Sequence, residues 1–132
     1  GAAGGLGFAF LSYTNAVLES GVKIILEETK LESFIKNADF VITGEGRLDG
    51  QTVMGKAPIG VAEIAKKCEK NVLAFGGCVA EDATLCNQYG IDAFFPILRT
   101  VTTLKEAMDF NHAKENLSAA VEQVFRLIQS FK

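Results

Sequence analysis

The sequence is poor in the residues that build metal centres and disulfide frameworks. It has one histidine, two prolines and three cysteines among 132 residues. Cys68, Cys78 and Cys86 are odd in number, show no Cys-x-x-Cys spacing and have no neighbouring histidine. This pattern excludes the usual zinc motifs and a disulfide framework. We therefore expect the three cysteines to be small buried hydrophobic side chains of a protein in a reducing compartment. His112 has no serine or cysteine partner at a spacing that would indicate a catalytic triad.

Long apolar runs and an excess of one charge are also missing. The apolar runs at residues 72–75 and 93–98 are far too short to span a bilayer, and the glycine-rich first residues lack the basic region of a signal peptide. Thirteen basic and sixteen acidic residues give a net charge of -3, with no basic cluster interleaved with aromatics. These absences argue against nucleic acid and membrane partners and favour a cytoplasmic location.

The composition is that of one ordinary globular domain. The chain is 48% hydrophobic and 22% charged, and it is long enough to bury a single core. The apolar pattern predicts strands over residues 39–44, 71–77 and 92–97 and helices over residues 6–18, 31–38, 59–70, 81–90, 102–111 and 112–131. Gly21 fits a helix stop, and residues 22–30 fit either a short strand or a helical turn.

The alternation of strands and helices predicts the fold class. We expect a three-layer α/β/α Rossmann-like domain with a mostly parallel sheet, spanning residues 1–132 as a single α/β region. Three or four strands are few for so many helices, so further strands are expected outside this sequence, in missing chain or in a partner subunit. An exposed sheet edge or apolar face would favour a homo-oligomer.

Functional side chains gather directly after the strand expected at residues 39–44. In open parallel sheets, ligands bind beyond the carboxyl ends of the strands, where helix N-termini favour anions. The segment supplies Glu45, Arg47, Asp49, Gln51, Thr52 and Lys56. This density of polar groups indicates either a ligand site or a solvated loop whose charges pair with one another.

The same segment nearly matches the phosphate-binding loop G-x-x-x-x-G-K-[ST]. Gly50 and Lys56 fit the pattern, but Ala57 replaces the hydroxyl residue that binds the nucleotide's magnesium. Pro58 removes an N–H donor, and six residues separate Thr43 at the strand end from Gly50. We therefore do not expect a standard phosphate-binding loop.

Two further glycine-rich segments have open interpretations. "GAAGGLG" does not satisfy G-x-G-x-x-G, yet its glycines would allow either close approach to a phosphate or tight helix packing. Gly76 and Gly77 end the second expected strand and suit backbone approach to a ligand. Glu81 and Asp82, which follow, fit helix-capping acids better than catalytic ones.

One long motif is specific. "ADFVITGEGRLDGQTVMGKAPIGVAEIAKK", with "GAAGGLGFAF" before it and "GIDAFFPI" after it, resembles the bacterial glycerate kinase family over essentially the whole chain. The shared core is T-G-E-G-x-[LI]-D-x-Q-T followed by G-K-x-P. Members of that family are much longer, so the resemblance implies the C-terminal third of a two-domain enzyme. Its N-terminal strands and inserted second domain would be absent, and the chain alone would be an incomplete catalyst.

The resemblance implies phosphoryl transfer from ATP, with Mg²⁺, to D-glycerate, and it favours 2-phosphoglycerate as the product. Phosphoryl transfer needs cations for the phosphates and a carboxylate for the metal or the hydroxyl proton. Lys56 would hold ATP phosphates and Arg47 the glycerate carboxylate or a phosphate. Asp49 and Glu45 would divide the metal and base roles, with Asp49 preferred as proton acceptor.

Six other residues would complete the implied site. Thr52, with Thr43 and Gln51, would give supporting polar contacts, and Gly4, Gly5 and Gly7 would line the phosphate or substrate region. The alternative is a non-catalytic ligand-binding or regulatory α/β module derived from the same fold.

Overall fold

The computed structural model describes Ser12, Thr14, Asn15 and residues 20–132. The predicted helix over residues 6–18 falls largely outside the described residues, and Gly4, Gly5 and Gly7 fall wholly outside them. The elements, in chain order, are α2 (Gly21–Glu28), α3 (Leu31–Ile35), β1 (Phe40–Leu48), the 3₁₀ helix η1 (Thr52–Met54), α4 (Ala57–Lys67), β2 (Asn71–Val79), the 3₁₀ helix η2 (Glu81–Tyr89), β3 (Ala93–Pro96), α5 (Leu104–Met108) and α6 (Phe110–Ser130).

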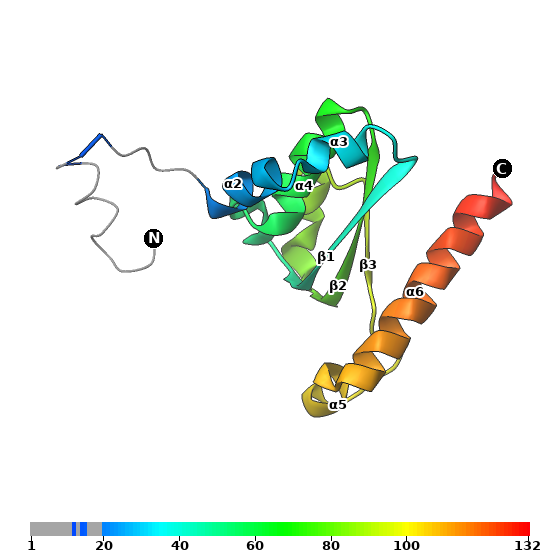
Figure 1. Cartoon of the computed structure of the whole chain (residues 1–132). Coiled ribbons are helices and arrows are strands. Elements are labelled where there is room, and N and C mark those ends of the chain that lie inside the picture. The colour runs from blue at the N-terminus through cyan, green and yellow to red at the C-terminus, as the bar shows by residue number, and fades with distance from the viewer. Residues whose placement is uncertain (1–11, 13, 16–19) are drawn as a thin grey trace.

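The three strands form one parallel sheet in the order β1-β2-β3. Helices α2, α3 and α4 lie on one side of this sheet and α6 lies on the other (Figure 1). Sequence-adjacent parallel strands require crossovers, which α4 supplies between β1 and β2 and η2 between β2 and β3. The predicted α/β fold with helices on both sides of a parallel sheet is confirmed.

Strand β1 runs farther than the sequence predicts. It was expected to end at Gly44 but continues to Leu48, with Glu45 opposite Gly76 and Leu48 opposite Val79. Glycines let the paired backbones come close here, since a Cβ on Gly77 would lie 2.7 Å from the Gly46 carbonyl oxygen. The extension places Glu45 and Arg47 on a strand rather than in a loop.

The core lies between the sheet and helix α4. Its members are buried side chains from the sheet, α3, α4, η2 and the segment before β3: Ile35, Val41, Leu48, Ile59, Ala62, Ala65, Val72, Ala74, Ala83, Cys86 and Ile91. Helix α2 packs against α4 at Gly60, where a Cβ would lie 2.7 Å from Val22 Cγ1. Small residues on α4 therefore let both the sheet and α2 approach it closely.

The opposite face of the sheet is less well covered. Val124 is the buried residue of α6, and the ring of Phe125 lies 5.4 Å from that of Phe40. The apolar side of α6 is only partly buried, because Leu117 and Phe125 remain 43% and 36% exposed. In the part of the chain that the structure describes, α6 covers this face of the sheet and packs on it only loosely.

Several local expectations change in the structure. Residues 22–30 are mostly helical, and Gly21 is the first residue of α2. The helix that Gly21 was expected to stop lies largely outside the described residues. The segment after β2 is a 3₁₀ helix that ends at Gly90, with φ 98°, and no side chain caps its start. Glu81 and Asp82 are therefore not hydrogen-bonding caps. Cys86 is buried as predicted, but Cys78 is exposed.

The ends of α4 and α5 carry residues typical of helix termini. Pro58 lies in the first turn of α4, and Lys66 and Lys67 lie in its last turn, where cations suit the helix dipole. Thr103 and Glu106 form the capping box that starts α5. Among the described residues, no helix is both long and apolar enough to cross a membrane.

Candidate active site

A tight turn at the end of β1 folds the chain back on itself. The Gln51 N–H donates to Asp49 Oδ1 at 3.0 Å, and the Thr52 N–H donates to the Asp49 carbonyl at 3.0 Å. An aspartate side chain that accepts from the backbone two residues later is typical of such turns. Gly55 then takes a left-handed conformation, with φ 91°, which glycine adopts at no steric cost. The turn returns Lys56, the N-cap residue of α4, to the end of β1.

Five predicted residues meet at this turn. Arg47 Nε donates to Asp49 Oδ2 at 3.1 Å. Lys56 Nζ lies 3.7 Å from Glu45 Oε1 and 3.8 Å from Asp49 Oδ1. The Thr52 hydroxyl accepts from the Asp49 N–H at 3.1 Å and donates to Glu45 Oε2 at 3.3 Å. We call these five residues, Glu45, Arg47, Asp49, Thr52 and Lys56, the strand-end cluster.

The strand-end cluster is graded from buried to exposed. Thr52 is fully buried, and the side chains of Asp49, Glu45 and Lys56 are 16%, 26% and 38% exposed. Arg47 is the most exposed member, at 62%. The most buried member is therefore the hydroxyl that contacts the Glu45 carboxylate and the Asp49 backbone, while the two cations are the most exposed members.

Electrostatics keep Asp49 ionised. Desolvation, the largest single influence, favours the neutral acid, but Lys56, the Gln51 N–H and Arg47 together outweigh it and hold the pKa of Asp49 below its ordinary value. A carboxylate stabilised in this way is well suited to hold a cation. It is a weaker proton acceptor than one whose pKa lies near neutrality.

The structure decides between the two interpretations of the segment only in part. The charges do pair with one another, as the solvated-loop alternative expected. However, Glu45 and Arg47 stand on a strand, and Thr52 is buried, so the segment is not a solvated loop. Thr43 lies earlier on β1 and is half-buried. Gln51 contributes its backbone N–H to Asp49.

The sequence did not predict that η2 packs against the turn after β1. The Asp82 carboxylate packs on Gly50, so that a Cβ there would lie 2.5 Å from Asp82 Oδ2. Cys86, also on η2, directs its thiol at the Asp49 carbonyl, with the sulfur 3.9 Å from the oxygen. Burial raises the pKa of the Cys86 thiol, and the Asp49 charge adds to this. The glycine at position 50 was the available signal, because a close approach requires one.

Gly46 is unlike the other glycines of the sheet. Among the described residues, and apart from its two chain neighbours, no heavy atom lies within 4 Å of the position its Cβ would take. Glycine inside a strand costs stability, so it usually marks a bulge or the close approach of a ligand or another backbone. The open space in front of Gly46, between Glu45 and Arg47 in the chain, is therefore a candidate ligand-facing surface.

The donor set fits a magnesium ion shared with a phosphate group. Mg²⁺ is usually held by one or two carboxylates, with waters and substrate phosphates filling the other positions. Glu45 and Asp49 supply two carboxylates that already share one cation, the Lys56 ammonium. Within the described part of the chain, no group of three or more His, Cys, Asp or Glu residues could hold a metal alone.

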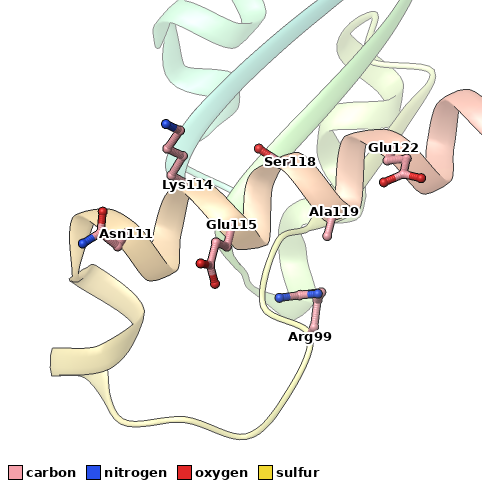
Figure 2. A pocket seen from close by; sticks show the side chains of 7 residues that line it. All are labelled: Arg99, Asn111, Lys114, Glu115, Ser118, Ala119 and Glu122. Carbon is pink, nitrogen blue, oxygen red and sulfur yellow. The ribbon is translucent and has the colours of Figure 1, made fainter.

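Two hollows lie elsewhere on the surface. One, of about 580 Å³, lies beside α6, and Figure 2 shows the Arg99 side chain and residues of α6 around it. The other, of about 820 Å³, lies among α2, α3 and α4. Both are lined by acidic and basic side chains together, and neither includes a member of the strand-end cluster.

The fold and the strand-end cluster define a class: an α/β protein with a charged site at the carboxyl end of a parallel sheet. The model of the glycerate kinase family matches residues 1–129, and the chain belongs to this family. The resemblance found in the motif is therefore confirmed.

Individual relatives agree with this assignment. The chain is 43% identical over 132 residues to a glycerate kinase of Bacillus subtilis, covering 100% of this chain and 34% of that protein. It is 43% identical over 124 residues to the glycerate 2-kinase of Escherichia coli, covering 94% of this chain and 32% of that protein. A crystal structure described as glycerate kinase 2 from Salmonella typhimurium matches with TM-score 0.66 and 36% identity, over 100% of this chain and 32% of that one. The chain thus spans about a third of the length of these relatives and corresponds to their C-terminal portion.

Proposed function

We propose that the strand-end cluster is part of the active site of a glycerate kinase that phosphorylates D-glycerate from ATP with Mg²⁺. Family membership supports the reaction class. The observation that carries the proposal is the meeting of two carboxylates with Lys56 and Arg47 at the carboxyl end of a parallel sheet. We further propose that the product is 2-phosphoglycerate, because one relative is named a glycerate 2-kinase.

The two cations have different tasks in this proposal. Lys56 stands at the N-terminus of α4, where the helix dipole also favours negative charge, and its flexible ammonium would bind ATP phosphates. Arg47 has a planar guanidinium at the exposed edge of the cluster, suited to two parallel hydrogen bonds with a carboxylate or phosphate. It would orient D-glycerate while remaining within reach of Asp49.

The two carboxylates would hold Mg²⁺ and receive the hydroxyl proton. When bound, Mg²⁺ would neutralise charge on the phosphates. The lowered pKa of Asp49 suits holding a cation, so the structure moves our preference for the proton acceptor toward Glu45. Thr52 is too deeply buried to touch a ligand in this conformation, and it would act by holding Glu45 and Asp49 in position.

A hybrid enzyme tests the proposal. In it, this chain replaces the matching third of the Bacillus subtilis glycerate kinase, which aligns with all 132 residues. We expect the folded hybrid to form ADP when both D-glycerate and MgATP are present, with phosphate on carbon 2 by nuclear magnetic resonance. A folded hybrid that binds ATP without turnover would instead support the non-catalytic ligand-binding module.

A further inference from the structure

Lys56 occupies an unusual position between the two carboxylates. Its Nζ lies nearly equally far from Glu45 Oε1, at 3.7 Å, and from Asp49 Oδ1, at 3.8 Å. Those oxygens belong to the two side chains that would have to share a divalent ion. The ammonium thus lies within reach of both carboxylates that would hold such an ion.

The ammonium is held by charge rather than by directed hydrogen bonds. Charge-assisted hydrogen bonds between nitrogen and oxygen are usually about 2.7–2.9 Å long, well below both distances here. Lys66, ten residues later, shows the contrast: its Nζ lies 2.8 Å and 2.6 Å from the two oxygens of Asp92. Lys56 is therefore the more easily displaced of the two lysines.

The carboxylates do not depend on Lys56 for their positions. Asp49 is held by Arg47 Nε and the Gln51 N–H, and Glu45 accepts from the buried Thr52 hydroxyl. Removing the ammonium would leave two anchored carboxylates facing a shared space. Such an arrangement attracts a cation, because like charges that cannot move apart favour a counter-ion.

We propose that Lys56 is an exchangeable counter-ion of the metal site: Mg²⁺ displaces its ammonium from Glu45 and Asp49, and the released ammonium then binds nucleotide phosphates. This inference rests on the proposed function and adds a coupling to it. In the free site, the positive charge of Lys56 balances the negative charge of the two ionised carboxylates, so the site binds the metal weakly. Binding of phosphates draws Lys56 away and thereby strengthens metal binding, and by linkage the metal strengthens phosphate binding to the same degree.

Mn²⁺ binding without nucleotide tests the exchange. We would titrate the 132-residue chain with Mn²⁺ and follow free Mn²⁺ by electron paramagnetic resonance. Lys56→Met removes the competing cation, so it should tighten Mn²⁺ binding at least about fivefold, or about 1 kcal/mol. Lys66→Met makes the same change of net charge at Asp92 and should alter the affinity less than twofold. Glu45→Gln with Asp49→Asn should abolish the binding.

An unchanged or weakened Mn²⁺ affinity in Lys56→Met overturns the proposal, as does Mn²⁺ binding that survives loss of both carboxylates.

A measurement on the wild-type sequence covers the case in which Lys56→Met does not fold. With lysines carrying ¹³C-methyl groups, Mg²⁺ should shift the Lys56 resonance and leave that of Lys66 in place. If neither resonance moves, the exchange is wrong. The proposed function would still stand if turnover of the hybrid enzyme depended on Lys56.

Discussion

Replacement of Thr52 by valine probes the anchor of the strand-end cluster. The two side chains have nearly the same shape, so the change removes the hydroxyl and leaves packing in place. Thr52 is fully buried, and its oxygen accepts from the Asp49 N–H at 3.1 Å while donating to Glu45 Oε2 at 3.3 Å. Valine leaves the Asp49 N–H and one carboxylate oxygen of Glu45 without these partners.

The cost follows from the two lost hydrogen bonds. A buried donor left without an acceptor costs about 1–3 kcal/mol, and the partly exposed Glu45 can turn to water. We therefore expect Thr52→Val to lower the free energy of unfolding by about 1–2 kcal/mol. In a domain of this size, that corresponds to about 3–10 °C in melting temperature.

Urea unfolding followed by circular dichroism measures this loss. Thr29→Val is the matched control, because the Thr29 hydroxyl donates to the Leu26 carbonyl at an exposed helix end, 3.1 Å away. An exposed change of this kind should stay within about 0.5 kcal/mol. If Thr52→Val is as mild as Thr29→Val, then Thr52 does not anchor the carboxylates, and the argument for a preorganised site fails.

Two further predictions concern the backbone and the pH dependence. Gly46→Ala should keep or slightly raise stability, since no atom of the described residues beyond its chain neighbours lies within 4 Å of the added Cβ, and it should weaken substrate binding in the hybrid enzyme. Gly77→Ala should destabilise the chain, since its Cβ would lie 2.7 Å from the Gly46 carbonyl oxygen. Equal stability losses would refute the assignment of Gly46 to a ligand-facing surface. Because the folded pKa of Asp49 is lowered from 3.8, its stabilising effect is complete above that value and disappears as the pH falls through the folded pKa. Asp49→Asn should therefore flatten the acid limb of stability below about pH 4 in urea titrations, and an unchanged acid limb would contradict the ion pairs described.

The strands and the core helix could be predicted from the sequence because their patterns are local. Residues 71–77 carry a buried apolar run bounded by polar residues and glycines, and α4 has its small apolar side chains at helical spacing. Both patterns depend on burial, which the order of residue types reports directly.

The extension of β1 could not be predicted in this way. Residues 44–48 are rich in glycine and charge, which is typical of a loop, yet their backbones pair with the end of β2. Backbone pairing needs no particular side chain, and the partner segment lies about thirty residues away in the chain. Asp82 and Gly50 are similarly far apart in the chain, so a local pattern could not predict their packing either.

The candidate site was predictable as a set of residues but not as an arrangement. The motif predicted Glu45, Arg47, Asp49 and Lys56 as site residues, and the structure places all four side chains together. The burial of Thr52 and the sharing of Lys56 between two carboxylates depend on the turn at Gly55, whose geometry a residue pattern does not report.

Turnover of the hybrid enzyme with single substitutions tests the central claim most directly. Steady-state ADP formation would be measured for Lys56→Ala, Arg47→Ala and Asp49→Ala, with Lys66→Ala as a folded control outside the strand-end cluster. We predict that kcat/KM falls at least about a hundredfold in each of the first three and changes less than about threefold in the control. Near-normal turnover after loss of Lys56, Arg47 and Asp49 would contradict a phosphoryl-transfer site at the end of β1.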